Sequence, residues 1–192
     1  MSKSTITRKT KETDITVTLD TCGSGVVNCE SGNGFFDHMI NALGKHAGYD
    51  IDIKCAGDTE VDFHHSAEDI GIVLGMAFCK CTEDKRGIRR FGEAATPMDE
   101  ALAQANVDIS GRPYLVFHAD FPAERVGDFE TELVEEFFRA FAMNALVTLH
   151  INVIYGKNAH HLIEAIFKST GRALAAATEV VGDSLPSTKG VL

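Results

Sequence analysis

The sequence predicts an α+β protein built from two similar halves. The pattern His-His-x-x-Glu occurs twice, at residues 64–68 and 160–164, and the offset of 96 residues (160 − 64) is half of the 192-residue length. The order helix, strand, helix is predicted twice, with a β-hairpin before each copy. A period this long does not fit a solenoid and indicates internal duplication, so we divide one compact unit into halves at 1–95 and 96–192.

The first half opens with strand patterns. Residues 15–19 alternate apolar and polar side chains, and residues 21–25 supply a turn into two valines at 26–27. This pattern is typical of a β-hairpin. The glycine-rich stretches at 23–25 and 32–34 are both interpreted as hairpin turns.

Two helices flank a strand in the rest of this half. Apolar residues recur at helical spacing over 35–47, and Gly48 would end that helix. Residues 49–55 alternate as in a half-buried strand. A second helix is expected over 64–81, and its first turn carries the first His-His pair.

The second half repeats this order. A turn at 110–113 separates two strand patterns, and an amphipathic helix, an alternating strand and a long helix follow. The predicted elements are strands at 101–110, 113–120 and 147–153 and helices at 131–146 and 158–181.

Composition limits the possible functions. With 18 Lys and Arg against 28 Asp and Glu, the net charge of −10 argues against a nucleic-acid or anionic-membrane partner, although local basic residues could still bind a small anion. No stretch approaches the ~18 apolar residues that span a bilayer, and the polar start lacks a secretion signal, so we expect a cytoplasmic protein. The five cysteines form an odd, unpatterned set, as expected of reduced thiols.

The duplicated pattern predicts a metal centre with two ions. On a helix, Glu68 can share a face with either His64 or His65, whose side chains point about 100° apart. One pair therefore serves two ions more easily than one, and two facing helices supply ligands to both. Imidazole and carboxylate ligands suit Mn²⁺, Fe²⁺ or Zn²⁺ better than Ca²⁺. The candidate ligands of the second copy are His160, His161 and Glu164.

Aligning the two halves adds one ligand to each. The helix at 35–47 falls opposite the helix at 131–146, and this alignment pairs His38 with Glu136. Both residues can bind a metal, so each half would offer four ligands.

Basic residues near these motifs suggest an anion site. Arg90 follows the first metal helix, Arg112 lies in a tight turn, Lys168 lies two turns after His161, and Lys189 is in the tail. Guanidinium groups are suited to phosphate oxygens.

Seven motifs in order resemble one family closely, the imidazoleglycerol-phosphate dehydratases. They are FFDHM at 35–39, DFHHSAEDIGI at 62–72, GIRRFG at 87–92, PMDEAL at 97–102, DISGRPYL at 108–115, NAHHLIEAIFK at 158–168 and PSTKGVL at 186–192. The resemblance implies two fused halves, each a four-stranded sheet with helices packed on one face. It also implies a homo-oligomer of 24 subunits with sites between subunits and two Mn²⁺ ions per site.

The resemblance also implies roles for individual residues. His38, His65, Glu68 and His161 would bind one ion, and His64, His160 and Glu164 the other. The fourth ligand of the second ion is commonly His in this family, whereas this chain has Glu136. Residues implied to contact the substrate are Glu12, Arg90, Arg112, Lys168, Ser187, Thr188 and Lys189.

The implied reaction is loss of water from imidazole glycerol phosphate to give imidazole acetol phosphate in histidine biosynthesis, with the ring bound between the metals as imidazolate. Glu12, Glu68 and Glu164 are the candidate proton carriers, and the sequence does not choose among them. Two rivals stay open. A metal-storage oligomer would need the ligands without the basic residues, and a zinc hydrolase would fit the doubled ligand set less well.

Overall fold

Two four-stranded sheets form the outer layers of the protein. The computed structural model describes residues 3–190. The first sheet has the order β1 (Lys3–Lys9), β2 (Thr13–Asp20), β4 (Asp50–Gly57) and β3 (Val27–Glu30). The second has the order β5 (Phe91–Met98), β6 (Ala101–Asp108), β10 (Thr148–Tyr155) and β7 (Tyr114–His118), and a short ribbon joins β8 (Arg125–Val126) to β9 (Phe129–Glu130).

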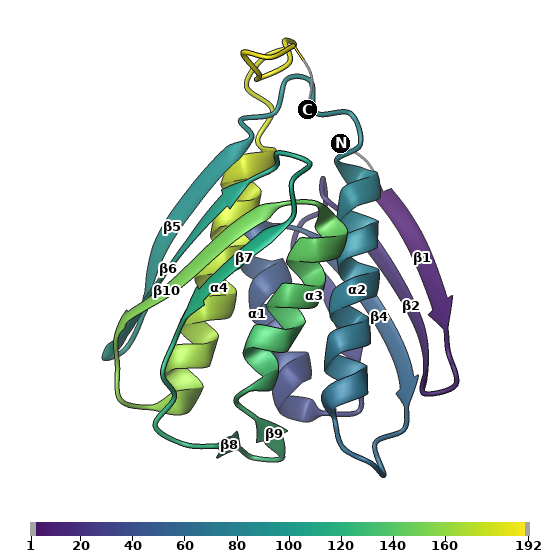
Figure 1. Ribbon diagram of the computed structural model, residues 1–192, viewed down its shortest axis with the longest axis vertical. Coiled ribbons are helices and arrows are strands. Elements are labelled where there is room, and N and C mark those ends of the chain that lie inside the picture. The colour runs from purple at the N-terminus through teal and green to yellow at the C-terminus, as the bar shows by residue number, and fades with distance from the viewer. Residues whose placement is uncertain (1–2, 191–192) are drawn as a thin grey trace.

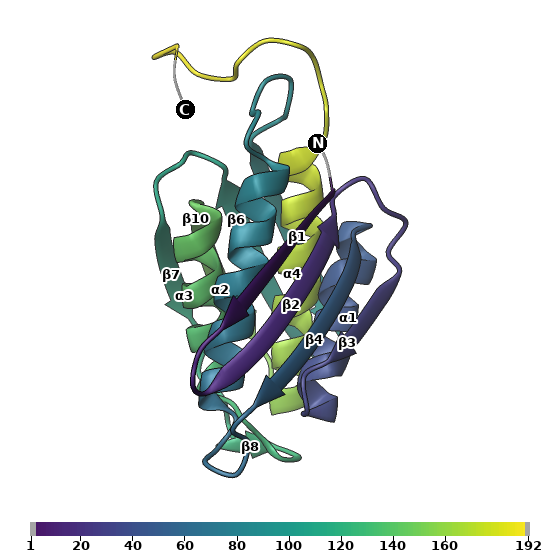
Figure 2. The ribbon, with the colours of Figure 1, turned by 90° about the vertical axis from the view of Figure 1, so that its right-hand side faces the viewer.

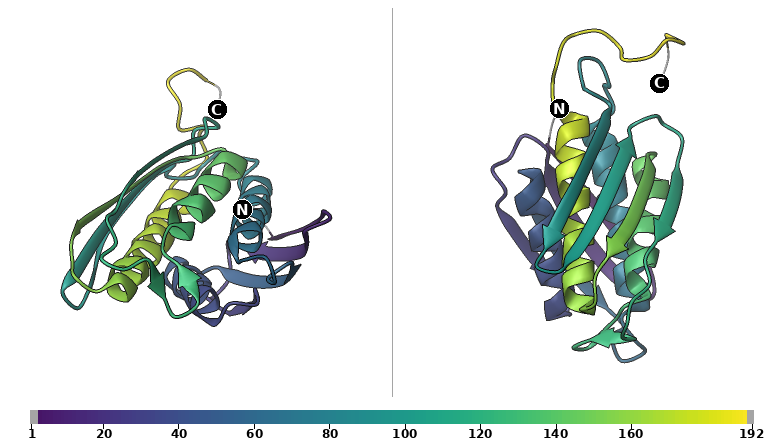
Figure 3. Two further views of the ribbon diagram at one scale, coloured as in Figure 1. Left: turned by 60° about the horizontal axis from the view of Figure 1, so that its bottom comes forward. Right: turned by 90° about the vertical axis from the view of Figure 1, so that its left-hand side faces the viewer.

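In the described part of the chain four helices are present, and they lie between the two sheets (Figures 1, 2 and 3). They are α1 (Gly34–Ala47), α2 (His64–Cys81), α3 (Leu133–Ala145) and α4 (Ala159–Thr178). Helices α1 and α2 cover the first sheet, and α3 and α4 cover the second. The halves meet through helix pairs, because α1 packs on α4 and α2 packs on α3.

The two sheets have the same topology, which confirms the predicted α+β fold of two similar halves. In each sheet an antiparallel hairpin, β1–β2 or β5–β6, pairs with a central strand, and that strand pairs in parallel with an edge strand. Strand β5 crosses the boundary that we placed between residues 95 and 96, and it pairs with β6 along its whole length.

The hairpin predicted between residues 15 and 27 is wrong. Strand β2 pairs with β1 and β4, while β3 pairs in parallel with β4 at the other side of that strand. The reason is that α1 connects β3 to β4 as a crossover, and β4 brings its buried Ile51 and Ile53 opposite Leu19 and Val17. Strands β6 and β7 are likewise separated by β10.

Asparagine caps start the two helices that contribute to the candidate site. The Asn33 side chain accepts a hydrogen bond from Phe36 N, and the Asn158 side chain accepts one from His161 N. The stretch 32–34 is therefore a helix start and not the predicted hairpin turn. Gly48 ends α1 in the left-handed conformation (φ 69°), as predicted.

Glycines set the two helix crossings at equivalent positions. A Cβ on Gly171 of α4 would lie 2.4 Å from Leu43 O of α1, and a Cβ on Gly75 of α2 would lie 2.6 Å from Phe141 O of α3. The offsets are 96 residues for the glycines (171 − 75) and 98 for their partners (141 − 43). The crossing of α1 on α4 is therefore repeated by α3 on α2, in the register that pairs His38 with Glu136.

An aromatic core holds the helices together. The ring centroids of Phe36 and Phe137 are 5.2 Å apart, and those of Phe137 and Phe167 are 5.5 Å apart. These rings are fully buried and come from α1, α3 and α4, so they fix the helices on which the candidate ligands lie. Within residues 3–190, no helix is long and apolar enough to cross a membrane.

Candidate metal centre

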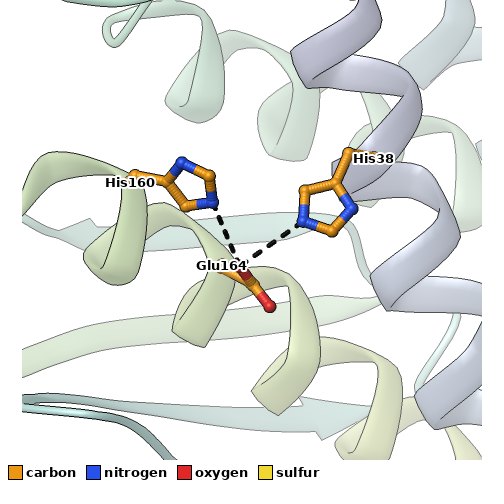
Figure 4. Close-up of side chains that lie close together, drawn as sticks. All are labelled: His38, His160 and Glu164. Atoms are coloured by element: carbon orange, nitrogen blue, oxygen red, sulfur yellow. Dashed lines mark hydrogen bonds and ion pairs between the residues drawn. The ribbon is translucent and has the colours of Figure 1, made fainter.

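Three predicted ligands meet where α1 crosses the start of α4. His38 Nε2 lies 3.5 Å from Glu164 Oε2, and His160 Nε2 lies 3.2 Å from the same oxygen (Figure 4). One ligand atom from each residue lies within 4.8 Å of the other two. Between residues 3 and 190, no other group of three or more His, Cys, Asp or Glu side chains meets this criterion. Two imidazoles and a carboxylate suit Mn²⁺, Fe²⁺ or Zn²⁺.

The surroundings of Glu164 keep its carboxylate charged. Burial acts to raise the pKa of Glu164, but the hydrogen bond and charge of Lys168, together with His38 and His160, outweigh it and lower the pKa. Lys168 Nζ lies 2.6 Å from Glu164 Oε1, which leaves Oε2 facing the two histidines. Phe35 packs edge-on against the His160 ring at 5.1 Å and fixes its plane.

The structure groups the ligands differently from the division implied by the resemblance. That division placed His38 with His65, Glu68 and His161, and His160 with the other ion. Within one chain His38 instead meets His160 and Glu164, because α1 crosses α4 and not α2.

The repeat relates a second set of residues to this group. By the offsets of the helix crossings, His38 corresponds to Glu136, His160 to His64, and Glu164 to Glu68. The ligand atoms of this second set are not gathered as closely in the described part of the chain. Glu136 Oε2 instead lies 3.6 Å from the guanidinium of Arg139, a residue of the next helical turn.

The remaining histidine of each motif is held by a carboxylate from a loop. His65 Nδ1 lies 3.0 Å from Asp58 Oδ2, and His161 Nδ1 lies 2.7 Å from Glu100 Oε2. These hydrogen bonds raise the pKa of both imidazoles. The hydrogen bonds that Glu100 accepts from His161 and from two backbone amides lower its pKa to about 2. No role was predicted for Asp58 or Glu100, because neither belongs to the repeated motif, although Glu100 lies within PMDEAL at 97–102.

Glu12, a predicted proton carrier, lies in the exposed turn between β1 and β2. Its backbone carbonyl accepts a hydrogen bond from the amide of Asp58, whose side chain contacts His65, so Glu12 lies near the first metal motif. Among residues 3–190 its side chain has no hydrogen bond or ion pair, which leaves both oxygens open to a ligand.

Five predicted substrate contacts converge in a separate hollow of about 660 Å³. It lies at the end of the molecule that carries the tail, at the top of Figure 1. Lys85, which the sequence analysis missed, adds a further positive charge to its wall. The predicted residues that line it are Arg90, Arg112, Ser187, Thr188 and Lys189.

The Arg90 side chain is held in this hollow by three hydrogen bonds. Its guanidinium donates to both oxygens of Asp108, at 2.7 and 3.1 Å, and to the carbonyl of Pro186 at 2.9 Å. Its backbone adopts the left-handed conformation (φ 73°), which is unfavourable for a residue with a side chain. Arg112 also lies near Asp108, at 3.7 Å, so one carboxylate orients both arginines.

The metal group and the basic hollow lie at opposite ends of α4. The Arg90 amide donates to the carbonyl of Ala177, which is 17 residues after His160 (177 − 160). At 1.5 Å per residue, this separation along the helix is about 25 Å. Two predicted substrate contacts lie outside the hollow: Lys168 lies beside Glu164 in the metal group, and Glu12 lies in the turn between β1 and β2.

The chain matches the family model described as imidazoleglycerol-phosphate dehydratase over residues 31–174. A relative of that name from Gluconacetobacter diazotrophicus is 55% identical over 191 residues, which cover 98% of this chain and 96% of the relative. The crystal structure of imidazoleglycerol-phosphate dehydratase from Staphylococcus aureus subsp. aureus N315 aligns with a TM-score of 0.85 and 42% identity, over 93% of this chain and 99% of that one. The crystal structure of the Pyrococcus furiosus enzyme in complex with (S)-C348 aligns with a TM-score of 0.85 and 38% sequence identity, over 97% of this chain and 100% of that one.

Proposed function

Since the chain belongs to the imidazoleglycerol-phosphate dehydratase family and is a carbon–oxygen lyase of histidine biosynthesis, we propose that it dehydrates imidazole glycerol phosphate at a two-metal site formed between subunits. The product is imidazole acetol phosphate. The observation that carries the proposal is the separation of the metal group from the basic hollow within one chain.

The residues of the metal group fit Mn²⁺. His38, His160 and Glu164 would hold one ion, and the corresponding Glu136, His64 and Glu68 would hold the second. His65 and His161 are held by Asp58 and Glu100 and would complete ion sites built by neighbouring chains. When bound, the two ions would act as Lewis acids on the ring nitrogens and favour the imidazolate form of the substrate.

The distance between the two groups supports a site built from more than one chain. The substrate measures less than about 10 Å from ring to phosphorus, since its bonds are about 1.5 Å long. The metal group and the basic hollow of one chain are about 25 Å apart along α4. The phosphate held by Arg90, Arg112, Ser187 and Lys189 of one protomer would therefore belong to a ring held by another protomer. A closed homo-oligomer, for which we propose 24 subunits, provides such contacts.

We assign the proton transfer to Glu12. Glu12 is exposed and lies near the first metal motif, whereas Glu164 is buried and paired with Lys168. Glu12 would take the proton from the central carbon of the side chain as hydroxide leaves the carbon bonded to the ring. The enol that forms then becomes the ketone of the product. Arg90 and Lys189 would fix the phosphate and so bring the central carbon to Glu12.

Mixed oligomers test the shared site. Arg90→Ala should disable only the hollow, and His160→Ala only the metal group, so each variant alone should lose activity. If the two variants are co-expressed, up to about a quarter of the sites should combine an intact hollow with an intact metal group and regain activity. Mixed oligomers that form normally yet stay inactive would contradict a site shared between chains.

A further inference from the structure

The second histidine of each motif, His65 or His161, has only one ring nitrogen left for a ligand. His161 and His65 bond through Nδ1 to Glu100 and Asp58, at 2.7 and 3.0 Å. An ionised carboxylate can only accept hydrogen bonds, so the nitrogen that faces it must carry the proton. In the neutral imidazole Nε2 then keeps its lone pair, as a metal ligand requires. The carboxylate nearest to His161 Nε2, on Asp99, is 3.7 Å away, beyond hydrogen-bond distance.

We propose that Glu100 and Asp58 are positioning residues that fix the tautomer and orientation of His161 and His65 for metal binding in a neighbouring protomer. This inference rests on the proposed function, since it assumes that these two histidines donate to an ion. The loop carboxylates of Glu100 and Asp58 are not among the residues that we propose for substrate binding or proton transfer.

The two carboxylates reach equivalent nitrogens from positions that are not equivalent in the repeat. Glu100 lies in the turn between β5 and β6, where the first half has Glu12, by the offset of the two hairpins (101 − 13 = 88). Asp58 follows β4, and its counterpart after β10 is Gly156, by the offset of these strands (148 − 50 = 98). The halves therefore share the imidazole–carboxylate contact without sharing the residue that makes it. This divergence also leaves Glu12 available for the substrate.

The contacts of Glu100 suggest a sharp substitution. Its Oε1 accepts hydrogen bonds from the amides of Lys157 and Asn158, at 3.1 and 2.8 Å, and its Oε2 faces His161. In Glu100→Gln, the amide oxygen can keep both backbone contacts while the NH₂ group faces the ring. That group is a donor, so Nδ1 must accept and the proton moves to Nε2. The loop stays anchored, but the nitrogen that should bind metal is blocked.

Mn²⁺ affinity of the assembled protein tests the inference by competition with a chelating dye. We expect Glu100→Gln and Asp58→Asn each to weaken Mn²⁺ binding 10- to 100-fold, as is typical for residues that support a metal ligand. Glu93→Gln, which alters an exposed carboxylate on β5, is the matched control and should bind as the wild type does.

Repeating the Glu100→Gln substitution in a His161→Ala variant shows whether Glu100 acts through His161 or has only a structural role. In His161→Ala, Glu100→Gln should cause no further loss of Mn²⁺ affinity, because the ligand that it positions is absent. Equal losses in both backgrounds, or no loss in either, would overturn the inference while leaving the proposed function intact. A wild-type protein that binds no Mn²⁺ would overturn the metal proposal and this inference with it.

Discussion

The substitution Gly171→Ala tests the crossing that assembles the metal group. The new Cβ would lie 2.4 Å from Leu43 O and 3.3 Å from Ala47 N, both backbone atoms of α1. Backbone atoms cannot turn aside as a side chain can, so α1 must move away from α4. His38 lies on α1 less than two turns before Leu43, and it moves with the helix.

The cost follows from two opposing terms. Overpacking of a close helix contact costs about 3 kcal/mol, and the better helix propensity of Ala returns about 1 kcal/mol. A net loss of about 2 kcal/mol in a chain of 192 residues lowers the midpoint of thermal unfolding by roughly 4–8 °C. Thermal unfolding of the metal-free protein measures this loss, and Mn²⁺ binding should weaken as His38 moves away from Glu164.

Two further glycine substitutions serve as comparisons, one at the equivalent crossing and one at a position without contacts. Gly75→Ala meets Phe141 O at 2.6 Å across the equivalent crossing and should lose similar stability. Gly34→Ala places its Cβ where no atom lies within 4 Å, and the midpoint should stay unchanged or rise. A Gly171→Ala protein that unfolds at the wild-type temperature and binds Mn²⁺ with wild-type affinity would refute the close crossing.

Two further substitutions and one pH titration test the predicted substrate contacts and the two raised histidine pKa values. Lys168→Ala removes a cation that we expect to contact the substrate. A hydrogen bond to a charged group is worth about 1.5–3 kcal/mol, so kcat/KM should fall by roughly 10- to 100-fold at unchanged Mn²⁺ content, whereas a storage protein would show no such effect. Asp108→Asn releases the guanidinium of Arg90, and KM should rise about tenfold with little change in kcat. The raised pKa values of His65 and His161 stabilise the metal-free protein below about pH 6.5, and this stabilisation is lost as pH rises through the raised values. The unfolding midpoint of the metal-free protein should therefore fall as pH rises above about 6.5, while Mn²⁺ binding strengthens.

Much of the fold could be predicted because the signals are local. Helical and alternating periodicities located all four helices and the central strands, and the offset of 96 residues revealed the duplication. Strand partners could not be predicted in the same way. The turn after β2 resembles a hairpin, yet the crossover through α1 places β4 beside β2. Pairing depends on which buried faces meet, and single-strand periodicity does not encode that.

The same distinction applies to the site. His38, His160 and Glu164 were predicted as ligands from residue type and repetition, but their grouping depends on which helices cross. Gly171 and Gly75 permit the close helix crossings, but this role can be recognised only once the backbone atoms opposite each glycine are known. The positioning carboxylates were missed because Asp58 and Glu100 lie on loops at unrelated places in the two repeats.

The repeat also relates the turn of the basic hollow to a different arrangement in the first half. By the hairpin offset, Arg112 corresponds to Ser24 (112 − 88), and by the strand offset, Thr148 corresponds to Asp50 (148 − 98). In the first half, Asp50 Oδ1 accepts hydrogen bonds from the amides of Ser24 and Val26, at 2.8 and 2.9 Å. In the second half, Thr148 instead donates its hydroxyl to the carbonyl of Arg112, at 3.0 Å.

The consequence is electrostatic. In the first half a carboxylate of the protein occupies the turn where the second half presents a guanidinium, and the amide contacts lower the pKa of Asp50 so that it stays charged. The Asp50 carboxylate already accepts hydrogen bonds from the backbone amides of that turn, so these amides are not available to bind a phosphate. The turn at Arg112 shares one nearby carboxylate, Asp108, with Arg90. Lys85 and Lys189 add their charges to the two arginines, so positive charge remains in excess in the hollow. The duplicated scaffold thus repeats the His-His-x-x-Glu motif in both halves but places the basic hollow in the second, as the proposed substrate with two ring nitrogens and one phosphate would require.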